Sequence, residues 1–333
     1  MSVSVIVPAA GRSSRFPDMR PKWMLTHPFG NLMLIESIRD LDLTGVSVVY
    51  ITVLREHISK YECEQGIYNA ISDANIPCEC KLVILDEPTL SQPETVYETI
   101  KSQNIKGSIF IKDSDNSFRT RPCLENSVCN IDLNDIGLVN ASNKSYVEIN
   151  DEGIIKNIVE KQVISSTFCT GGYSFQSATE FCNYYKALNN DNDLYISHVI
   201  YSMLLDGHIF HSKKVSECLD WGTLEDWNRY KNKFATLFVD IDGVIVKNSA
   251  KYFGDVWGTT EAIHNNVDII NKLYTTGRVK IILTTSRSST SQLITENQLK
   301  KISLNYDDIV YDLPHAKRII INDFSNTNPY KTC

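Results

Sequence analysis

Short apolar runs bounded by turn residues recur along the first half of this 333-residue chain, and amphipathic, helix-length segments separate the first few of them. This alternation is typical of βαβ units and predicts a largely parallel sheet. The strands expected from it are Val3–Val7, Val46–Val53, Lys81–Leu85, Ser108–Ile111 and Ile136–Val139.

A β-hairpin is expected at Tyr146–Val159, because Asn150–Gly153 is a turn signal flanked by alternating residues. The polar segments Asp73–Pro77 and Asn189–Asp193 predict loops before and after it. The first half of the chain therefore combines parallel and antiparallel strands.

A second α/β series begins after the charged segment Glu225–Lys233. The expected elements are a buried strand at Thr236–Val239 ending at Asp240, a helix at Val267–Leu273, and strands at Val279–Leu283 and Arg318–Ile321. This restart predicts two domains, residues 1–232 and residues 233–333.

Composition narrows the classes of protein. Hydrophobic residues make up 42% and charged residues 22%, which is ordinary for a globular protein. The net charge of −7 argues against nucleic acid or an anionic membrane as the main partner, so phosphorylated ligands need a few placed cations or a metal. Nine irregularly spaced cysteines and the lack of a long apolar run predict a cytoplasmic protein without membrane insertion.

The first candidate site is the loop Ala9–Arg15, which follows the first predicted strand. Ligands of α/β proteins bind at the carboxyl ends of parallel strands, and small residues let backbone N–H groups approach a phosphate there. Arg15 and Lys22 could add positive charge. The P-loop and dinucleotide-binding patterns are absent, so a solvated loop with scattered arginines is the alternative on this evidence alone.

The stretch Pro8–Phe16 followed by Pro21-Lys22 resembles the signature of the sugar-phosphate nucleotidyltransferases, which include nucleoside-diphosphate-sugar pyrophosphorylases and cytidylyltransferases. The resemblance implies a Rossmann-like, mixed-sheet domain of the GT-A type. It also implies a loop that wraps a nucleoside triphosphate. The residues implied to form this cradle are Ala9, Ala10, Gly11, Arg12 and Ser13, with Arg15 and Lys22 on the phosphates; many members have glycine at the position of Arg12.

Further motifs of the same family follow in order. The resemblance implies a metal-binding aspartate after the strand at Ser108–Ile111, for which Asp115 is the better placed and Asp113 is the alternative. It places an acceptor phosphate on Lys161 of the pair Glu160-Lys161. A glycine-aromatic strand follows at Gly171–Phe175, and the box Asp220–Trp227 supplies Asp220 as the second metal ligand. Gln92 and Glu94 stand where relatives contact the base and sugar, but they depart from the family pattern and leave the base open.

The implied chemistry explains these residue types. An acceptor phosphate attacks the α-phosphorus of a triphosphate and displaces pyrophosphate, so negative charge must be neutralised. Carboxylates hold a hard Mg²⁺ ion, and lysine and arginine act as fixed cations. The expected partners are one of CTP, UTP, dTTP or GTP and a phosphorylated sugar or alcohol.

The second candidate site is Phe238–Ile245, where Asp240 and Asp242 follow the strand predicted at Thr236–Val239. It resembles the first motif of haloacid-dehalogenase (HAD)-type phosphatases. The resemblance implies that Asp240 attacks phosphorus, that Asp242 acts as acid and base, and that Thr285 grips the phosphoryl group, with Thr284 one register away.

The remaining phosphatase motifs are less regular. Lys317 lies near the place of the third-motif lysine, and Asp323 follows the predicted strand Arg318–Ile321. The resemblance implies a second Mg²⁺ site on Asp240, Asp242 and Asp323. It also implies a small, doubly wound domain without a large cap.

Together these patterns predict a bifunctional enzyme, a nucleotidyltransferase joined to a phosphatase, in the synthesis of capsule or surface-glycan precursors. Two alternatives stay open. In one, only the transferase is active and the second domain is structural. In the other, the chain is a nucleotide-binding scaffold without turnover. The sequence leaves open whether identical chains associate.

Overall fold

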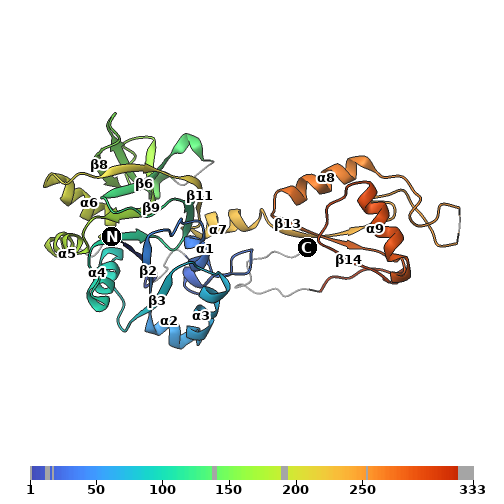
Figure 1. The fold of residues 1–333 in the computed structure, drawn as a ribbon, viewed down its shortest axis with the longest axis horizontal. Coiled ribbons are helices and arrows are strands. Elements are labelled where there is room, and N and C mark those ends of the chain that lie inside the picture. Colours follow the sequence, from blue (N-terminus) through green and yellow to red (C-terminus); the bar gives the residue numbers. More distant parts are fainter. Residues whose placement is uncertain are drawn as a thin grey trace. The chain divides into compact units, whose positions relative to one another are not determined.

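The computed structural model describes residues 2–11, 16, 19–136, 141–188, 194–252 and 254–321. It divides into two compact units, Met1–Trp227 and Asn228–Cys333 (Figure 1). The division falls inside helix α7 (Leu224–Lys231), whereas the sequence pattern places it just after that helix, at about residue 233. No helix among the described residues combines the length and apolar character needed to cross a membrane.

The first unit is organised around a mixed sheet in the order β10-β6-β9-β4-β1-β2-β3, with the hairpin β7–β8 joined to β9. Strands β1 to β4 pair in parallel, whereas β9 runs antiparallel to both β4 and β6. The strands of this sheet are β1 Val3–Pro8, β2 Val46–Leu54, β3 Glu79–Leu85, β4 Ser108–Lys112, β6 Ser127–Asp132, β7 Ser145–Ile149, β8 Ile155–Glu160, β9 Thr167–Phe175 and β10 His211–Lys214. A separate antiparallel pair joins β5 (Asn116–Arg119) to β11 (Ser216–Asp220).

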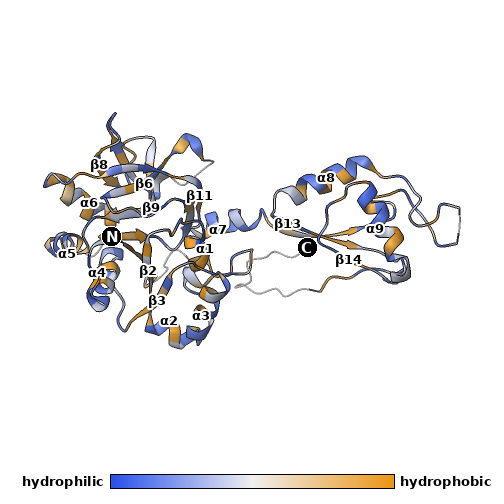
Figure 2. Ribbon diagram, viewed as in Figure 1, coloured by the Kyte–Doolittle hydropathy of each residue, from blue (hydrophilic) through white to orange (hydrophobic). Residues whose placement is uncertain are grey.

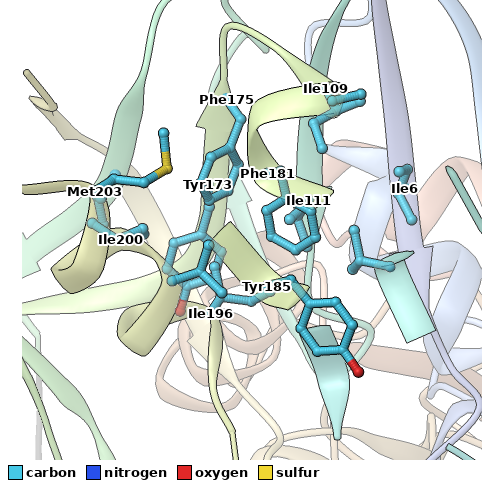
Figure 3. Close-up of a cluster of buried hydrophobic side chains, with 14 of the residues drawn as sticks. Ile6, Ile109, Ile111, Tyr173, Phe175, Phe181, Tyr185, Ile196, Ile200 and Met203 are labelled. Atoms are coloured by element: carbon cyan, nitrogen blue, oxygen red, sulfur yellow. The ribbon is translucent and has the colours of Figure 1, made fainter. Parts of the chain in front are cut away.

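Alternation along the strands builds a hydrophobic core on each face of this sheet. Ile6 belongs to the core covered by α4, α5 and α6 (Figure 3), while Val5 and Val7 belong to the core covered by α1, α2 and α3. The helices are α1 Met33–Arg39, α2 Arg55–Tyr61, α3 Glu64–Asp73, α4 Gln92–Gln103, α5 Ala178–Ala187 and α6 Ile196–Leu205. Because both faces are covered, the central strands β1 and β4 are mostly apolar.

Most strands expected in the first half of the chain are confirmed, as is the hairpin, whose turn closes with a 3.0 Å bond from the Gly153 N–H to the Asn150 carbonyl. Ile136 is not in a strand, and the rest of the run predicted at Ile136–Val139 lies outside the described residues, as does the loop at Asn189–Asp193. The sequence pattern did not reveal β5, β6, β10 or β11, because polar residues interrupt them.

The second unit contains three parallel strands in the order β12-β13-β14. Its elements are β12 Ala235–Asp240, β13 Val279–Thr284, β14 Asp308–Val310, α8 His264–Thr275 and α9 Gln292–Lys301. Helix α8 is amphipathic (Figure 2), and both helices contribute to the core that contains Ile281 and Leu283, α8 through Val267 and Ile270 and α9 through Leu299. These two β13 residues share one face of the sheet.

Three expectations for the second unit are wrong. The described helices pack on one sheet face only, so this part is not doubly wound. The strand expected to be buried is largely exposed, since Phe238 is 57% accessible on the face opposite the helices. Arg318–Ile321 is not a strand, and its isoleucines are exposed. An apolar run predicts a strand only where a neighbouring strand can pair with it.

Gly172 in β9 allows the close packing at the centre of the first unit. A Cβ atom there would lie 2.7 Å from Phe118 Cζ and 3.0 Å from Cys129 Sγ. We expect Gly172→Ala to lower the free energy of unfolding by about 1–3 kcal/mol, because overpacking forces the neighbours to move. Gly66→Ala is the matched control, since Gly66 lies in α3 with no atom near its Cβ position, and it should stabilise by about 0.5–1 kcal/mol. Urea unfolding of both variants measures the difference, and equal effects would contradict the packing argument.

Candidate functional site

The first candidate site lies at the carboxyl ends of β1 and β4. Ile6 pairs with Ile111, so the segments that leave these two strands start side by side. Ala9 and Ala10 are buried after β1, and Gly11 is exposed with open space at its Cβ position. Arg12, Ser13 and Arg15 lie outside the described residues, so their predicted phosphate contacts stay predictions.

Lys112 fixes the turn that follows β4. Its buried ammonium donates to the carbonyls of Asp113 and Asn116, each at 2.8 Å, and to the Asn116 side chain. The ammonium also lies 4.6 Å from the centre of the Phe118 ring. Burial lowers the pKa of Lys112 to about 8, and the nearby carboxylates of Asp113 and Asp115 oppose that shift. This lysine therefore holds the chain that presents both aspartates.

Asp113 lies in a crowded place. Its carboxylate accepts a hydrogen bond from the Gln92 side chain at the start of α4. A Cβ atom on Gly171, whose φ is +84°, would clash with the same carboxylate and with Asn116. Burial, together with the charge of Asp115, raises the pKa of Asp113 to about 6. Gln92 thus contacts the predicted site, while Glu94 instead accepts from the Leu90 N–H beside the first turn of α4.

Asp115 and Asp220 come together although they are far apart in the sequence. Asp220 ends β11 opposite Asn116 of β5, and the Trp221 N–H donates to the Asp115 carbonyl at 2.8 Å. The Asp115 carboxylate forms an ion pair with Lys22, and the Asp220 carboxylate forms one with Lys144. All four side chains are less than a fifth exposed.

The spacing of the box Asp220–Trp227 has a structural reason. The Gly222 N–H donates to the Asp220 carboxylate at 3.1 Å. Thr223 begins α7: its hydroxyl donates to the Asp226 carboxylate and accepts from the Asp226 N–H at 3.1 Å. Reciprocal bonds of this kind satisfy the free N–H groups of a helix start. The box therefore orients Asp220 and starts the helix that follows it.

Lys161 is joined to Lys144 by a backbone hydrogen bond. Its ammonium donates to the Tyr195 hydroxyl and lies 4.4 Å from the centre of that ring. Its backbone N–H donates to the Lys144 carbonyl at 2.9 Å, and its φ of 57° is left-handed. The neighbouring Glu160 carboxylate accepts from the hydroxyls of Ser145 and Ser197.

Lys112 and Lys144 are residues of this site that the sequence motifs do not indicate. Lys112 had a signal, because it is a lysine at the end of an apolar run that forms a buried strand. Lys144 had none, since it reaches Asp220 only after the chain has folded. Burial would lower the pKa of Lys144, but the Asp220 carboxylate raises it above its ordinary value.

The donor set suits a hard divalent cation. Asp115 and Asp220 provide oxygen ligands on adjacent backbone segments. The described residues hold no cluster of three or more histidine, cysteine, aspartate or glutamate side chains able to bind a metal. Mg²⁺ commonly uses one or two carboxylates and completes its shell with water and substrate phosphates, so two carboxylates fit this ion.

The second candidate site lies at the carboxyl end of β12. Asp240 ends this strand opposite Thr284 of β13, and Asp242 follows in the turn. Gly243 has a φ of +84°, and a Cβ atom there would lie 2.5 Å from the Asn248 side chain, so glycine suits this turn. Thr285 is buried, and its hydroxyl accepts from the Arg287 N–H at 3.0 Å.

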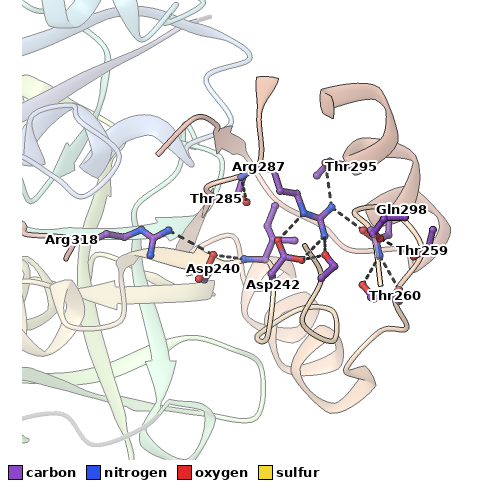
Figure 4. A network of polar contacts seen from close by, with 12 residues as sticks. Asp240, Asp242, Thr259, Thr260, Thr285, Arg287, Thr295, Gln298 and Arg318 are labelled. Carbon is purple, nitrogen blue, oxygen red and sulfur yellow. Dashed lines mark hydrogen bonds and ion pairs between the residues drawn. The ribbon is translucent and has the colours of Figure 1, made fainter. Parts of the chain in front are cut away.

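Arg287 is a fully buried guanidinium that grips Asp242 (Figure 4). Its Nε donates to one carboxylate oxygen at 2.8 Å and its Nη2 to the other at 2.7 Å. The remaining donors bind Thr295 at 3.2 Å, Gln298 at 2.9 Å and Ser249 at 3.4 Å. All five N–H groups thus have partners, which makes this arginine the fixed centre of the second site.

Two further predicted phosphatase residues stay predictions, since Lys317 is exposed and Asp323 lies outside the described residues. Arg318 approaches Asp240 instead, with its Nη2 3.9 Å from an Asp240 oxygen. The sequence analysis placed Arg318 in a strand and did not assign it to the site.

Comparisons with known proteins identify a fold for the first unit. None of the family models searched matches the chain, and no curated protein does. A nucleoside-diphosphate-sugar pyrophosphorylase from Vibrio cholerae RC9 is similar in structure, with a TM-score of 0.56 and 18% identity, over 68% of this chain and 98% of that one. The first unit is 227 of 333 residues, which is also 68%.

Two further solved structures agree with this. The inositol-1-phosphate CTP transferase from T. maritima gives a TM-score of 0.54 and 16% identity, over 68% of this chain and 91% of that one. A UTP-bound UGPase from Acinetobacter baumannii gives 0.53 and 14%, over 69% and 93%. The chain therefore contains the mixed α/β fold, with its parallel-dominated sheet, that these nucleotidyltransferases share.

The raised pKa of Asp113 predicts how stability depends on pH. Because the pKa is about 6 in the folded protein against 3.8 ordinarily, the folded state binds the proton more tightly, and stability falls as the pH rises from about 4 to about 6. We expect Asp113→Asn to be more stable than wild type by about 1–3 kcal/mol at pH 7, with no difference below pH 4. Asp151→Asn, at an exposed turn, is the control. Unfolding in EDTA at several pH values tests this, and a pH-independent gap would refute it.

Proposed function

We propose that the first unit transfers a nucleotidyl group from a nucleoside triphosphate to a phosphorylated acceptor. The observation that carries this proposal is the pairing of Asp115 with Lys22 and of Asp220 with Lys144, beside the loop that leaves β1. Two carboxylates and two ammonium groups provide ligands for a cation and counter-charges for phosphates. The similar fold of proteins described as a sugar pyrophosphorylase and a CTP transferase adds support.

The reaction would proceed as follows. An oxygen of the acceptor phosphate attacks the α-phosphorus, the bond to the β-phosphate oxygen breaks, and pyrophosphate leaves. Lys22 neutralises the triphosphate, with Arg15 and the loop Ala9–Ser13. Lys161 holds the acceptor phosphate. Asp115 and Asp220 would hold Mg²⁺, which stabilises the charge that develops on the phosphate oxygens.

The proposed substrates are one of CTP, UTP, dTTP or GTP and a phosphorylated sugar or alcohol. Gln92, which contacts Asp113 at the start of α4, is the side chain best placed to bind the nucleotide beside that carboxylate. A role in cytoplasmic synthesis of capsule or surface-glycan precursors is part of the proposal, since such pathways use nucleotide-activated sugars.

The test is a pyrophosphate-release screen of the four triphosphates against phosphorylated sugars and alcohols with Mg²⁺. We expect one pair to react, and Asp115→Asn and Asp220→Asn to lower kcat by about 100-fold or more, because each removes a charge that would hold the cation. Asp151→Asn should retain full activity. If the protein binds a triphosphate but none of the pairs releases pyrophosphate, the chain is a nucleotide-binding scaffold instead.

We also propose that the second unit is a HAD-type phosphatase. The observation favouring this is the arrangement of Asp240, Asp242 and the threonines Thr284 and Thr285 at the ends of two paired parallel strands. Asp240 would attack phosphorus and release the alcohol, and water would then free inorganic phosphate. Asp242 would transfer the protons. Mg²⁺ would lie on Asp240 with Asp242 and Asp323, and Lys317 would neutralise phosphate.

Phosphate release from the same panel of phosphorylated compounds tests the second activity. Asp240→Asn should abolish phosphate release, because it removes the nucleophile, and should leave pyrophosphate release unchanged. Asp268→Asn, on the exposed side of α8, is the matched control and should retain both activities. Should wild type and Asp240→Asn release equal amounts of phosphate, the second unit is structural.

A further inference from the structure

We infer that Lys22 and Lys144 occupy the cation site in the ligand-free protein, so that a divalent cation must displace them in order to bind. This inference rests on the proposed function for the identity of the cation ligands, Asp115 and Asp220. It adds a role that the sequence motifs do not assign to Lys144. It also makes cation binding dependent on a second, anionic ligand that receives the displaced ammonium groups.

The geometry carries the first step. Each carboxylate that could bind the cation is engaged by one ammonium group, Asp115 by Lys22 and Asp220 by Lys144. These pairs are held close together, because the Trp221 N–H binds the Asp115 carbonyl at 2.8 Å and β11 pairs with β5. A cation coordinated by both carboxylates would therefore meet two positive charges already in contact with its ligands.

Burial strengthens the repulsion between these ammonium groups and an arriving cation. Both lysine side chains are 19% exposed, and the two carboxylates are 11% and 17% exposed. Charges this far from water repel one another more strongly than surface charges do. A bare cation thus competes with two ammonium groups, whereas a cation bound to a triphosphate brings negative charge to which both lysines can turn.

Lys144 also has a structural link to the acceptor side. Its carbonyl accepts from the Lys161 N–H at 2.9 Å, so a change in the Lys144 backbone bears directly on the residue proposed to hold the acceptor phosphate. Release of Lys144 from Asp220 is therefore the step that would couple the cation, the nucleotide and the acceptor.

The experiment measures Mn²⁺ binding to the full chain without nucleotide, from the electron paramagnetic resonance signal of free Mn²⁺. Every protein carries Asp240→Asn, which removes one of the three proposed cation ligands of the second unit and is the same in all variants compared. Lys144→Met should bind Mn²⁺ about tenfold or more tightly than its parent, because one competing charge is gone. Lys144→Arg should behave like the parent, and so should Lys156→Met, which removes an exposed lysine of β8. Adding Asp220→Asn to Lys144→Met should abolish the gain.

Two outcomes would overturn the inference: Lys144→Met binds Mn²⁺ no more tightly than its parent, or its gain survives Asp220→Asn. If Lys144→Met does not fold, Lys22→Met is measured in the same way, with Asp115→Asn as the second change. The result is independent of turnover. If Lys144→Met gains Mn²⁺ affinity but no substrate pair releases pyrophosphate, the displacement holds and the transferase function is rejected. If a pair releases pyrophosphate but Lys144→Met gains no Mn²⁺ affinity, the transferase function holds and the displacement is rejected.

Discussion

The buried ammonium of Lys112 is the interaction on which the first site depends. A charged group without access to water is tolerated only where its donors are satisfied, and three oxygens of the turn Asp113–Asn116 satisfy this one. The turn is thereby fixed relative to β4. Asp113 and Asp115 project from it, and Asn116 begins the short strand that pairs with β11 and brings Asp220. Loss of this one cation would loosen every acidic residue of the site.

Charge explains how an acidic chain can hold a site for polyphosphates. The net charge is −7, yet Lys22, Lys112 and Lys144 are drawn into one small, poorly hydrated region. Lys22 and Lys144 neutralise Asp115 and Asp220, and Lys112 donates hydrogen bonds to the turn that presents Asp113 and Asp115. Three lysines thus lie beside the three carboxylates Asp113, Asp115 and Asp220, and a ligand that brings both signs of charge disturbs this balance least.

The sequence predicts what is local and apolar, and fails where structure depends on distant contacts. The central strands were predictable because sheets covered on both faces need apolar runs. Strands such as β5 and β10 were missed because polar residues dominate them. Asp113, Asp115 and Asp220 could be chosen from motifs, but Lys144 could not, since it lies 76 residues from its partner and carries no pattern. Arg318–Ile321 was predicted to be a strand and is not one, because it is apolar but has no strand beside it to pair with.

The second unit shows a different use of a buried cation. Arg287 meets Asp242 through two hydrogen bonds and directs its other donors to α9 and to the segment after β12. Oδ1 of Asp242 accepts from Arg287 and Ser249, and Oδ2 accepts from the Arg287 Nε, so a leaving group would meet Asp242 at the remaining lone pair of Oδ2. A phosphatase built in this way would exchange a proton at that oxygen while Arg287 holds the carboxylate in place, whereas a purely structural unit would use the Arg287 bonds alone. The Arg287 pair, more than the exposed Lys317, is therefore where the two interpretations of this unit differ physically.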